Sequence, residues 1–552
     1  MQKLVRLLVA AIVCIALAGA ASVSARAGEG LNYQNPVTAD MPVPVPPTKS
    51  CTVTLATDYT TNTASGAPQD YKGTFTPPAG CPGPWAKVVL NFTGQESGRQ
   101  YDRAGQISFG GAWIFFTSTP EPDPAGISWS AQKDVTEYSS LFTSGQPYTI
   151  SVPNYLNSVD TGVMHIGASL TFYEADGAHP APNVPDEVIG LGTQYVSSPQ
   201  AASFPVSGLP QNLERASLEI YPKGNSCEEF WYGGAPDDFA GPNGLCGGGD
   251  YREIDAALDG TPAGATLPFP NVFTGGVNPL IWRPIPAVDA FNLLPRTLDL
   301  TPFVGQLVDG GSHTVSLSVA NAVSYWGLTG NLLLWQDHGS TRTSGALTTD
   351  TLTSGPATAS VSEQPGSQSD VWHTTASRSY TISGWVDTSH GRVTTTVKRT
   401  LGFDDTNNLT VQNYRQNTTD DQTLHTVTTT TDASGTKTHT VDETDAVTAQ
   451  DMFQATPPHS DYWMLPAHVT VTKTRTESDG SNGATTFTSN LSNSTDGSGV
   501  LSEYNDGSYR LANGSDRQDY SYSDSTGVCY DHRISAAQGT VTSDQLSTAC
   551  KK

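Results

Sequence analysis

The 552-residue sequence has few basic residues and, beyond its N-terminus, no long apolar run. Lys and Arg together number 28, against 53 Asp and Glu, which gives a formal net charge of −25. A protein this acidic repels phosphates over long range, so nucleic acid is excluded as the expected partner. No later segment has the length and hydrophobicity of a membrane span, so we expect no membrane association. The acidic surface is compatible with acidic surroundings and equally with simple solubility.

Familiar catalytic and metal-binding signatures are also missing. Neither H-E-x-x-H nor C-x-x-C occurs and the 11 histidines are scattered, so we predict no metal site. The run Gly94–Gly98 differs from a G-x-S-x-G nucleophile elbow because its serine is displaced by one position. No glycine-rich phosphate loop is present, and we expect no cofactor. Carboxylates, arginines and aromatic rings therefore remain as the groups available for chemistry.

The N-terminus has the pattern of a secretory signal. Basic residues precede the apolar run Leu7–Ala18, and small residues up to Ala25 or Ala27 offer a cleavage site. We therefore assign residues 1–25 to a signal peptide and expect a secreted or periplasmic protein.

Cysteine usage agrees with export. Of the 7 cysteines, Cys14 leaves with the signal, and the remaining even set favours disulfides in an oxidising compartment. Six cysteines allow about 15 pairings. Their grouping along the chain favours Cys51–Cys81, Cys227–Cys246 and Cys529–Cys550. A metal site is the competing interpretation, but the spacing does not support it.

Composition and pattern predict an all-β chain with more than one domain. Gly, Pro, Thr and Ser are abundant, β-branched residues alternate with polar ones, and helical periodicity is nearly absent. Pro-rich stretches at 42–47 and 179–185 delimit two regions of short predicted strands. We interpret these regions as two tandem jelly-roll β-sandwiches, over 40–180 and 185–338.

The third region, 355–552, is rich in Thr and Ser and predicts longer, more polar strands. We interpret it as an antiparallel β accessory domain built from a ladder of hairpins. The predicted turns are His390-Gly391, Ser434-Gly435, Asp479-Gly480, Asn505-Asp506-Gly507 and Asn513-Gly514.

Charged and aromatic residues concentrate in three runs. Aromatic rings provide flat apolar faces for a pyranose, and carboxylates accept hydrogen bonds from hydroxyls or move protons, so such runs are typical of sugar-binding sites. Core packing beside a disulfide explains the second run equally well. The runs are Gly98-Arg99-Gln100-Tyr101-Asp102-Arg103 continuing to Ser118-Thr119-Pro120-Glu121-Pro122, then Cys227-Glu228-Glu229-Phe230-Trp231-Tyr232, and then Thr274–Ile285 with Trp282-Arg283-Pro284.

In this order and spacing, the three runs resemble the peptide-N-glycosidase A type of asparagine amidases, known from plants, fungi and some acid-living bacteria. The resemblance covers roughly Val88 to Trp335 and points to a bacterial, acid-active member. It implies hydrolysis of the amide that joins asparagine to the innermost N-acetylglucosamine of an N-glycan. The implied substrate is an N-glycosylated peptide or protein, and the implied activity tolerates core α1,3-fucose and acidic pH.

A more distant bacterial enzyme of this activity has two jelly rolls with its site at their interface, and the similarity implies residue roles. Its Trp-Asp-Arg run is similar to Tyr101-Asp102-Arg103. Its Cys-Ala-Glu-Trp run is similar to Cys227-Glu228-Glu229-Phe230, which selects Glu229 over Glu228 as the catalytic glutamate. Arg283 is a looser match to an arginine of its second domain. Asn154 stands where that enzyme has a third carboxylate.

Amide hydrolysis requires an oriented water, stabilisation of the developing oxyanion and protonation of the departing nitrogen. We therefore assign Asp102 to the water and Glu229 to proton movement, as the catalytic pair. The arginines would orient carboxylates, and the tryptophans would stack on sugar. The predicted substrate-binding residues are Arg103, Trp231, Arg283, Trp282, Asn154 and Glu228.

Two other functions use the same residue types. A secreted glycoside hydrolase would cleave a bond between sugars with the same carboxylates. A non-catalytic lectin or adhesin would keep the aromatic rings without needing both acids. We expect a monomer in any of these cases. Because the region after Gly339 contains none of the site residues, a chain that ends there is expected to retain chemistry on a small glycopeptide.

Overall fold

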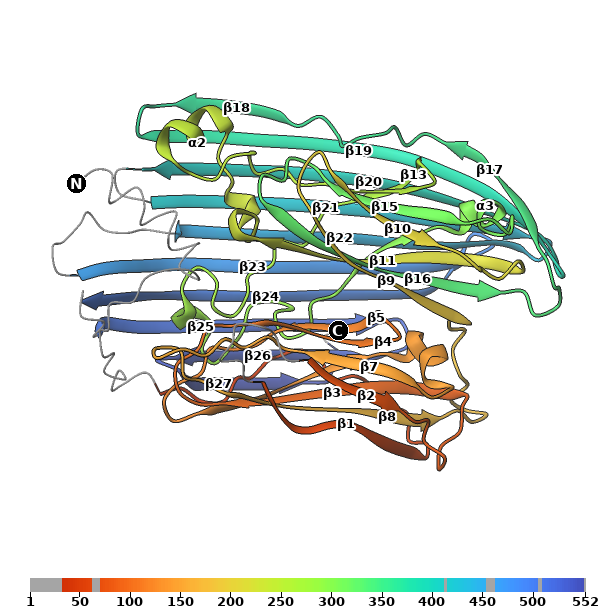
Figure 1. Ribbon diagram of the computed structural model, residues 1–552, viewed down its shortest axis with the longest axis horizontal. Helices are drawn as coiled ribbons and strands as arrows, with labels where there is room; N and C mark the ends of the chain where they lie inside the picture. The colour runs from red at the N-terminus through yellow and green to blue at the C-terminus, as the bar shows by residue number, and fades with distance from the viewer. Residues whose placement is uncertain (1–31, 62–69, 412–414, 453–461, 505–508, 551–552) are drawn as a thin grey trace.

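The structure is a computed structural model that describes residues 32–61, 70–411, 415–452, 462–504 and 509–550. Long C-terminal strands run across the length of the molecule, with the red and orange first sandwich over their lower part and the yellow-green second sandwich over their upper part (Figure 1). The predicted signal peptide, 1–25, lies outside the described residues. Among those described, no helix has the length and apolar character needed to cross a bilayer.

The first sandwich has the jelly-roll strand order. One sheet is ordered β1-β8-β3-β6 and the other β2-β7-β4-β5. Its period-two pattern is clear in β8, where every second side chain from Met164 to Phe172 is buried. Its elements are β1 Ser50–Thr61, β2 Asp70–Phe75, β3 Trp85–Glu96, β4 Ala104–Phe109, β5 Ala112–Ser118, β6 Ile127–Asp134, η1 Thr136–Phe142, β7 Gln146–Ser151 and β8 Met164–Glu174.

The second sandwich repeats this topology, with sheets ordered β14-β11-β16-β9 and β10-β15-β12-β13. Its strands are β9 Glu187–Val196, β10 Ala201–Val206, β11 Leu213–Asn225, β12 Ile254–Leu258, β13 Thr261–Thr266, β14 Arg296–Asp299, β15 His313–Val319 and β16 Tyr325–Gln336. Short helices occupy its long connections: η2 Ser226–Glu228, η3 Trp231–Gly233, α2 Asp237–Asn243, η4 Pro279–Trp282, η5 Thr301–Phe303 and α3 Val304–Leu307. The all-β prediction and the two jelly rolls are thus confirmed.

The two sandwiches pack directly against each other. Tyr138 donates to Glu219 Oε2 at 2.8 Å, and Asn331 Nδ2 donates to the Trp113 carbonyl at 2.7 Å. The first bond is buried and the second is partly buried, so polar groups left unpaired there would be costly. Four side chains of the second sandwich also complete the apolar core of the first, namely Val188, Phe291, Leu333 and Trp335. The relative placement of loops from the two sandwiches is therefore fixed by packing.

Within the described residues, the C-terminal region forms one 11-stranded sheet. β17 and β18 both pair with β19, and β19 to β27 follow one another as antiparallel neighbours. β17 shows that the sheet begins before residue 355, the predicted boundary. Its strands are β17 Ser344–Asp350, β18 Ser360–Pro365, β19 Ser369–Thr388, β20 Gly391–Thr410, β21 Arg415–Asp432, β22 Gly435–Met452, β23 Tyr462–Ser481, β24 Ala484–Tyr504, β25 Tyr509–Asp524, β26 Cys529–Ala537 and β27 Thr540–Ser547.

Two of the predicted hairpin turns are wrong. Gly391 and Gly435 take positive φ at hairpins, as predicted. Asp479-Gly480 and Asn513-Gly514 instead lie inside β23 and β25, and the turn between β23 and β24 uses Asn482-Gly483. At Gly514 the absence of a side chain admits the backbone of Leu280, so this glycine marks a close approach rather than a turn. The predicted turn at 505–507 lies outside the described residues.

The C-terminal sheet contacts the second sandwich over one face rather than being connected to it only by the chain. Buried side chains of β19 to β23, such as Tyr380 and Val469, belong to the same apolar cluster as the core of the second sandwich. Arg296 of β14 forms ion pairs with Glu443 and with Asp445 of β22. Residues 34–40 also contact this sheet, where the Ala39 amide donates to Gln518 Oε1 at 2.6 Å.

Three disulfides join the cysteines in the predicted pairs. The Cα–Cα distances are 5.8 Å for Cys51–Cys81, 5.7 Å for Cys227–Cys246 and 5.2 Å for Cys529–Cys550, within the range of ordinary disulfides. The second bond closes the loop that carries Glu228 and Glu229, and so constrains the backbone on both sides of the candidate site residues.

Candidate active site

Two carboxylates of the first sandwich meet a loop of the second. Asp102 lies in the connection from β3 to β4, and Glu121 follows β5. A hydrogen bond from the Arg103 amide to Thr119 Oγ1, 2.9 Å long, holds these two connections together. Ser118 Oγ and Thr274 Oγ1 are 2.9 Å apart, which ties β5 to the loop of the second sandwich.

Gly275 of this loop lies directly against both carboxylates. A β-carbon at Gly275 would lie 2.5 Å from Asp102 Oδ1 and 2.7 Å from Glu121 Oε1, so no other residue fits without displacing them. The Gly275 amide also donates a hydrogen bond to Asp102. Burial raises the pKa of Asp102 above its ordinary range, although this hydrogen bond and the charges of Arg103 and Lys223 oppose the shift.

Arg283, which follows η4, is the partner of Glu121. Its Nη2 donates to Glu121 Oε2 at 2.8 Å, and both side chains are only 12% exposed. The Tyr33 ring lies 5.1 Å from the guanidinium carbon, and the Tyr33 hydroxyl donates to the Glu121 carbonyl. Burial raises the pKa of Glu121 to about 7. The charge of Arg283 opposes this shift, and the charge of Asp102 adds to it. The N-terminal segment thus contributes a side chain to this cluster.

Glu229 approaches the same place from the end of β11. It is half-buried and follows η2. Burial raises its pKa to about 7, with a further contribution from the charge of Asp102 and an opposing one from Lys223. Lys223 interacts electrostatically with both acids, so it lies where it can stabilise negative charge on either. The structure therefore brings together Asp102, Glu229, Arg103 and Arg283, as predicted from sequence.

Arg103 contacts several residues of the first sandwich besides its neighbour Asp102. Its Nη2 donates to Gln100 Oε1 at 2.6 Å, and its guanidinium carbon lies 5.3 Å from the centre of the Tyr155 ring. Behind it is Glu96, 3% exposed, whose two oxygens have no hydrogen-bond partner within the described part of the chain. Burial raises the pKa of Glu96 to about 8, so this carboxyl is neutral at acidic pH.

The predicted sugar-stacking tryptophans are buried. Trp231 is 3% exposed and packs on Phe403 of the C-terminal sheet, and Trp282, also 3% exposed, donates its indole N–H to the Gly276 carbonyl. Neither presents a face to a ligand, contrary to the prediction. The exposed rings beside Asp102 and Arg103 are Tyr101 (46%) and Tyr155 (37%). Their rings, unlike those of the two tryptophans, are open to solvent.

Glu228 and Asn154 also have structural rather than substrate-facing positions. Glu228 is fully buried and accepts hydrogen bonds from Arg252 Nε at 2.6 Å and Trp326 Nε1 at 2.8 Å. Asn154 is 1% exposed and donates to two backbone carbonyls, so it does not replace a catalytic carboxylate. The prediction of substrate contacts for both residues is wrong, because their polar atoms are already enclosed by protein.

The sequence analysis missed Glu121, Lys223 and Tyr33 as site residues. Glu121 lies in a motif that it quoted, and the proline on each side is a signal of a fixed loop. Lys223 lies near the end of β11 and gave no distinguishing pattern in the sequence. Tyr33 is close to the site only through folding, since Glu121 is 88 residues away in sequence.

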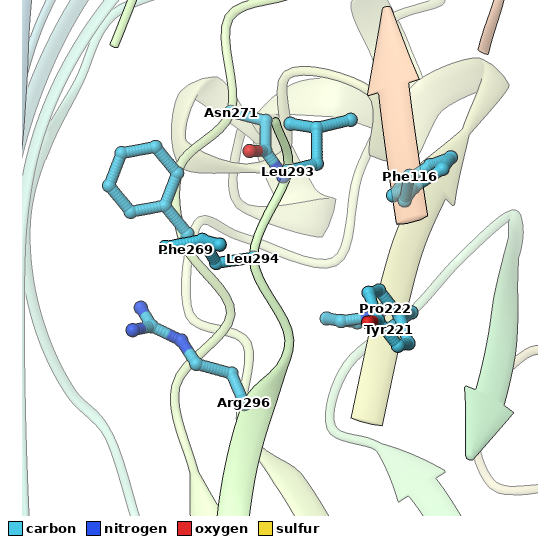
Figure 2. Close-up of a pocket in the computed structure, with 8 residues that line it drawn as sticks. All are labelled: Phe116, Tyr221, Pro222, Phe269, Asn271, Leu293, Leu294 and Arg296. Carbon is cyan, nitrogen blue, oxygen red and sulfur yellow. The ribbon is translucent and has the colours of Figure 1, made fainter. Parts of the chain in front are cut away.

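Two other features do not belong to this site. A cavity between β11 and residues 269–296 is lined by both sandwiches (Figure 2), but its volume of about 10 Å³ suits no more than a water molecule. Glu214, Asp337 and His390 could bring three ligand atoms together. Asp337 already accepts hydrogen bonds from Ser389 and Gly339. The predicted absence of a metal and of a cofactor stays a prediction.

A sequence profile of the family described as peptide N-acetyl-beta-D-glucosaminyl asparaginase amidase A matches residues 42–353, more than half of the chain. The chain belongs to this family. It is 34% identical over 382 residues to the peptide-N4-(N-acetyl-beta-glucosaminyl)asparagine amidase A of Prunus dulcis. That alignment covers 64% of this chain and 66% of the Prunus protein, so slightly less than two thirds of the relative's length is matched.

Solved structures with resemblance to this member of the amidase A family include PNGase F, a glycosylasparaginase from Flavobacterium meningosepticum. It is 14% identical, covers 52% of this chain and 96% of its own, and gives a TM-score of 0.37. PNGF-II is 13% identical, with 52% and 65% coverage and a TM-score of 0.38. Scores this low carry no conclusion about function.

Proposed function

We propose that this protein hydrolyses the amide between asparagine and the innermost N-acetylglucosamine of N-glycosylated peptides or proteins, releasing the glycan and leaving aspartate. One observation carries the proposal. The carboxyls of Asp102 and Glu121 both lie against the position that a β-carbon of Gly275 would take, and the charge of Asp102 is close enough to Glu229 to raise the pKa of Glu229. Membership of the amidase A family supports the same reaction.

The reaction requires one carboxylate and one carboxylic acid. Asp102, held by the Gly275 amide, accepts a proton from water as the water oxygen adds to the amide carbon. Glu229, whose pKa of about 7 keeps it protonated at acidic pH, donates a proton to the nitrogen as the C–N bond breaks. The products are an aspartate side chain and a glycan with an amino group at its reducing end.

Three further groups would hold charge and substrate. Arg283 keeps Glu121 in place through the 2.8 Å bond, and Lys223 balances the charge that moves between Asp102 and Glu229. Tyr101 and Tyr155, exposed next to Asp102 and Arg103, would pack on the apolar faces of the sugar or peptide.

We also propose that the protein works outside the cytoplasm, as a monomer without a cofactor. The signal-like N-terminus and the three disulfides support export. The net charge of −25 supports a partner other than nucleic acid, and no membrane surface is needed for the reaction.

The decisive experiment is incubation with an N-glycopeptide in water enriched in heavy oxygen, with both products weighed. An amidase transfers one heavy oxygen to the peptide, as aspartate, and leaves the glycan intact. A glycoside hydrolase would label a sugar and leave sugar attached to asparagine. A lectin would release nothing, and either of these results would reject the proposal.

A further inference from the structure

Three glycines of the C-terminal sheet lie against the turn that precedes Arg283. Gly497 and Gly499 are on β24, and Gly514 of β25 is the cross-strand partner of Gly499. A β-carbon at Gly497 would lie 2.5 Å from the Ile281 carbonyl oxygen, and one at Gly514 would lie still closer to that of Leu280. We call these three residues the glycine patch. Its lack of side chains lets η4 contact the strands backbone to backbone.

Hydrogen bonds fix the same loop to the sheet on both sides of η4. Before η4, Asn278 Nδ2 donates to the Leu465 carbonyl of β23 at 2.8 Å. After η4, the Ile285 amide donates to Asp516 Oδ2 of β25, also at 2.8 Å. Asn278 is fully buried, as is Ile285, which packs in a cluster with residues of β26. The loop is therefore held by neighbouring strands of one sheet.

This loop carries two groups of the candidate active site. Its first part supplies Gly275, whose amide donates to Asp102. Its last part supplies Arg283, whose guanidinium pairs with Glu121. Only seven residues separate Gly275 from Arg283, and the contacts with β23 and β25 fall between or directly beside them.

We propose that the C-terminal sheet is part of the active-site architecture, with the glycine patch and Asp516 as positioning residues for Gly275 and Arg283. The proposal rests on the proposed function for its kinetic consequences. It reverses the expectation that a chain ending near Gly339 retains chemistry, because such a chain would lack every contact described here.

A methyl group at Gly514 tests this directly. The obstacle would be the Leu280 backbone carbonyl, which cannot rotate away as a side chain can. β25 is held by ladders to β24 and β26, so η4 must move instead. A displacement of about 1 Å at a catalytic group can cost up to about 100-fold in rate. We therefore expect Gly514→Ala to lower kcat by about 10-fold or more, with a smaller change in KM.

The matched control is Gly480→Ala, in β23 of the same sheet. A β-carbon there meets its nearest neighbour, the Ala484 carbonyl oxygen, at 3.5 Å, an ordinary contact. A second pair of variants, at Asp516, tests the same proposal without adding a methyl group to the contact. Asp516→Asn keeps an oxygen that can accept from the Ile285 amide, whereas Asp516→Ala does not. We expect near wild-type kcat for Asp516→Asn and a loss for Asp516→Ala.

Hydrogen–deuterium exchange of the full-length variants separates this proposal from the proposed function. Amides of residues 274–285 should exchange faster in Gly514→Ala and Asp516→Ala than in wild type, Gly480→Ala or Asp516→Asn, while those of the first sandwich stay unchanged. This measurement needs no turnover. If the wild-type protein had no amidase activity, the proposed function would be rejected, but the positioning role could still be tested by exchange. Unchanged exchange at 274–285 in both disruptive variants would overturn the positioning role. The positioning role would also be overturned if the activity of these variants fell only in proportion to their content of folded protein.

Discussion

Glu121 Oε2 and Arg283 Nη2 form a 2.8 Å ion pair between the two sandwiches. The carboxylate comes from the first jelly roll and the guanidinium from the second, so the pair exists only when both are docked. Because both side chains are largely buried, removing either one is costly, since the remaining charge would be left buried and unpaired. Since Glu121 also adjoins Asp102 at Gly275, the pair connects domain packing to the proposed chemistry.

Loss of the Glu121 charge should therefore reduce turnover. We expect Glu121→Gln to lower kcat/KM by about 100-fold, the effect typical of a group engaged in proton transfer or its support. Arg283→Ala should cost at least as much, because it leaves Glu121 buried without its cation. Steady-state kinetics on a purified glycopeptide would measure both. Glu174→Gln, which removes a surface ion pair with Lys49 in the same sandwich, is the control. Wild-type rates for Glu121→Gln would exclude Glu121 from the site.

Asp102→Asn should abolish deglycosylation while the fold is retained. The change keeps the volume of the side chain but removes its ability to accept a proton from water. Thermal unfolding should show a folded protein, since Asp102 lies in a connection rather than in either sandwich core. The exposed Asp70→Asn in β2 provides the comparison. Substantial turnover by a well-folded Asp102→Asn protein would exclude Asp102 as the principal base.

Glu229 and Glu228 should respond in opposite ways. Glu229→Gln is expected to lower kcat by at least about 100-fold with little change in stability. Glu228→Gln leaves Arg252 buried without its charge partner, and is expected to lower the free energy of unfolding by about 3 kcal/mol with little change in the kcat of the folded protein. Denaturant unfolding and active-site kinetics on both variants separate the two effects. A larger rate loss for Glu228→Gln would reverse the assignment.

Local signals were sufficient for much of the fold. Alternation in segments such as Met164–Phe172 predicted strands because one face of a sandwich sheet must be buried. Proximity along the chain was sufficient for the disulfides. Local signals failed at Gly514. The glycine there suggested a turn, but it is required by a contact with Leu280, which is distant in sequence. The docking of the C-terminal sheet was not visible for the same reason, since its contact face contains buried polar residues such as Asp445 and Asn407.

The site was only partly predictable. The register of Cys227-Glu228-Glu229 pointed to one carboxylate of the pair, and the structure separates them clearly, with Glu228 in an ion pair. Aromatic residues were less informative. A tryptophan in a motif can pack in the core or face a ligand, and residue type alone does not distinguish the two. Trp231 and Trp282 pack inside, whereas Tyr101 is exposed.

The pH dependence of kcat/KM should be bell-shaped with its maximum below neutrality. Asp102 must be ionised to accept a proton, and its raised pKa places the acid limb above the ordinary aspartate range. Glu229 must be protonated to donate, so activity falls as pH rises through its pKa of about 7. Lys223 lowers the pKa of both acids by its charge. Lys223→Gln should therefore move both limbs to higher pH.

The exposed Lys72→Gln in the first sandwich is the control for this shift, since it removes an equal charge outside the site. Profiles of wild type and both variants, measured at constant ionic strength, test the assignment, because a general effect of net charge would move the profiles of the two variants alike relative to wild type. If Lys223→Gln left both limbs in place, Lys223 would not be the cation that sets these pKa values. If only the alkaline limb moved, Lys223 would act on Glu229 and not on Asp102, and the water-activating base would have to be sought among the remaining carboxylates around Gly275, of which Glu121 is the nearest.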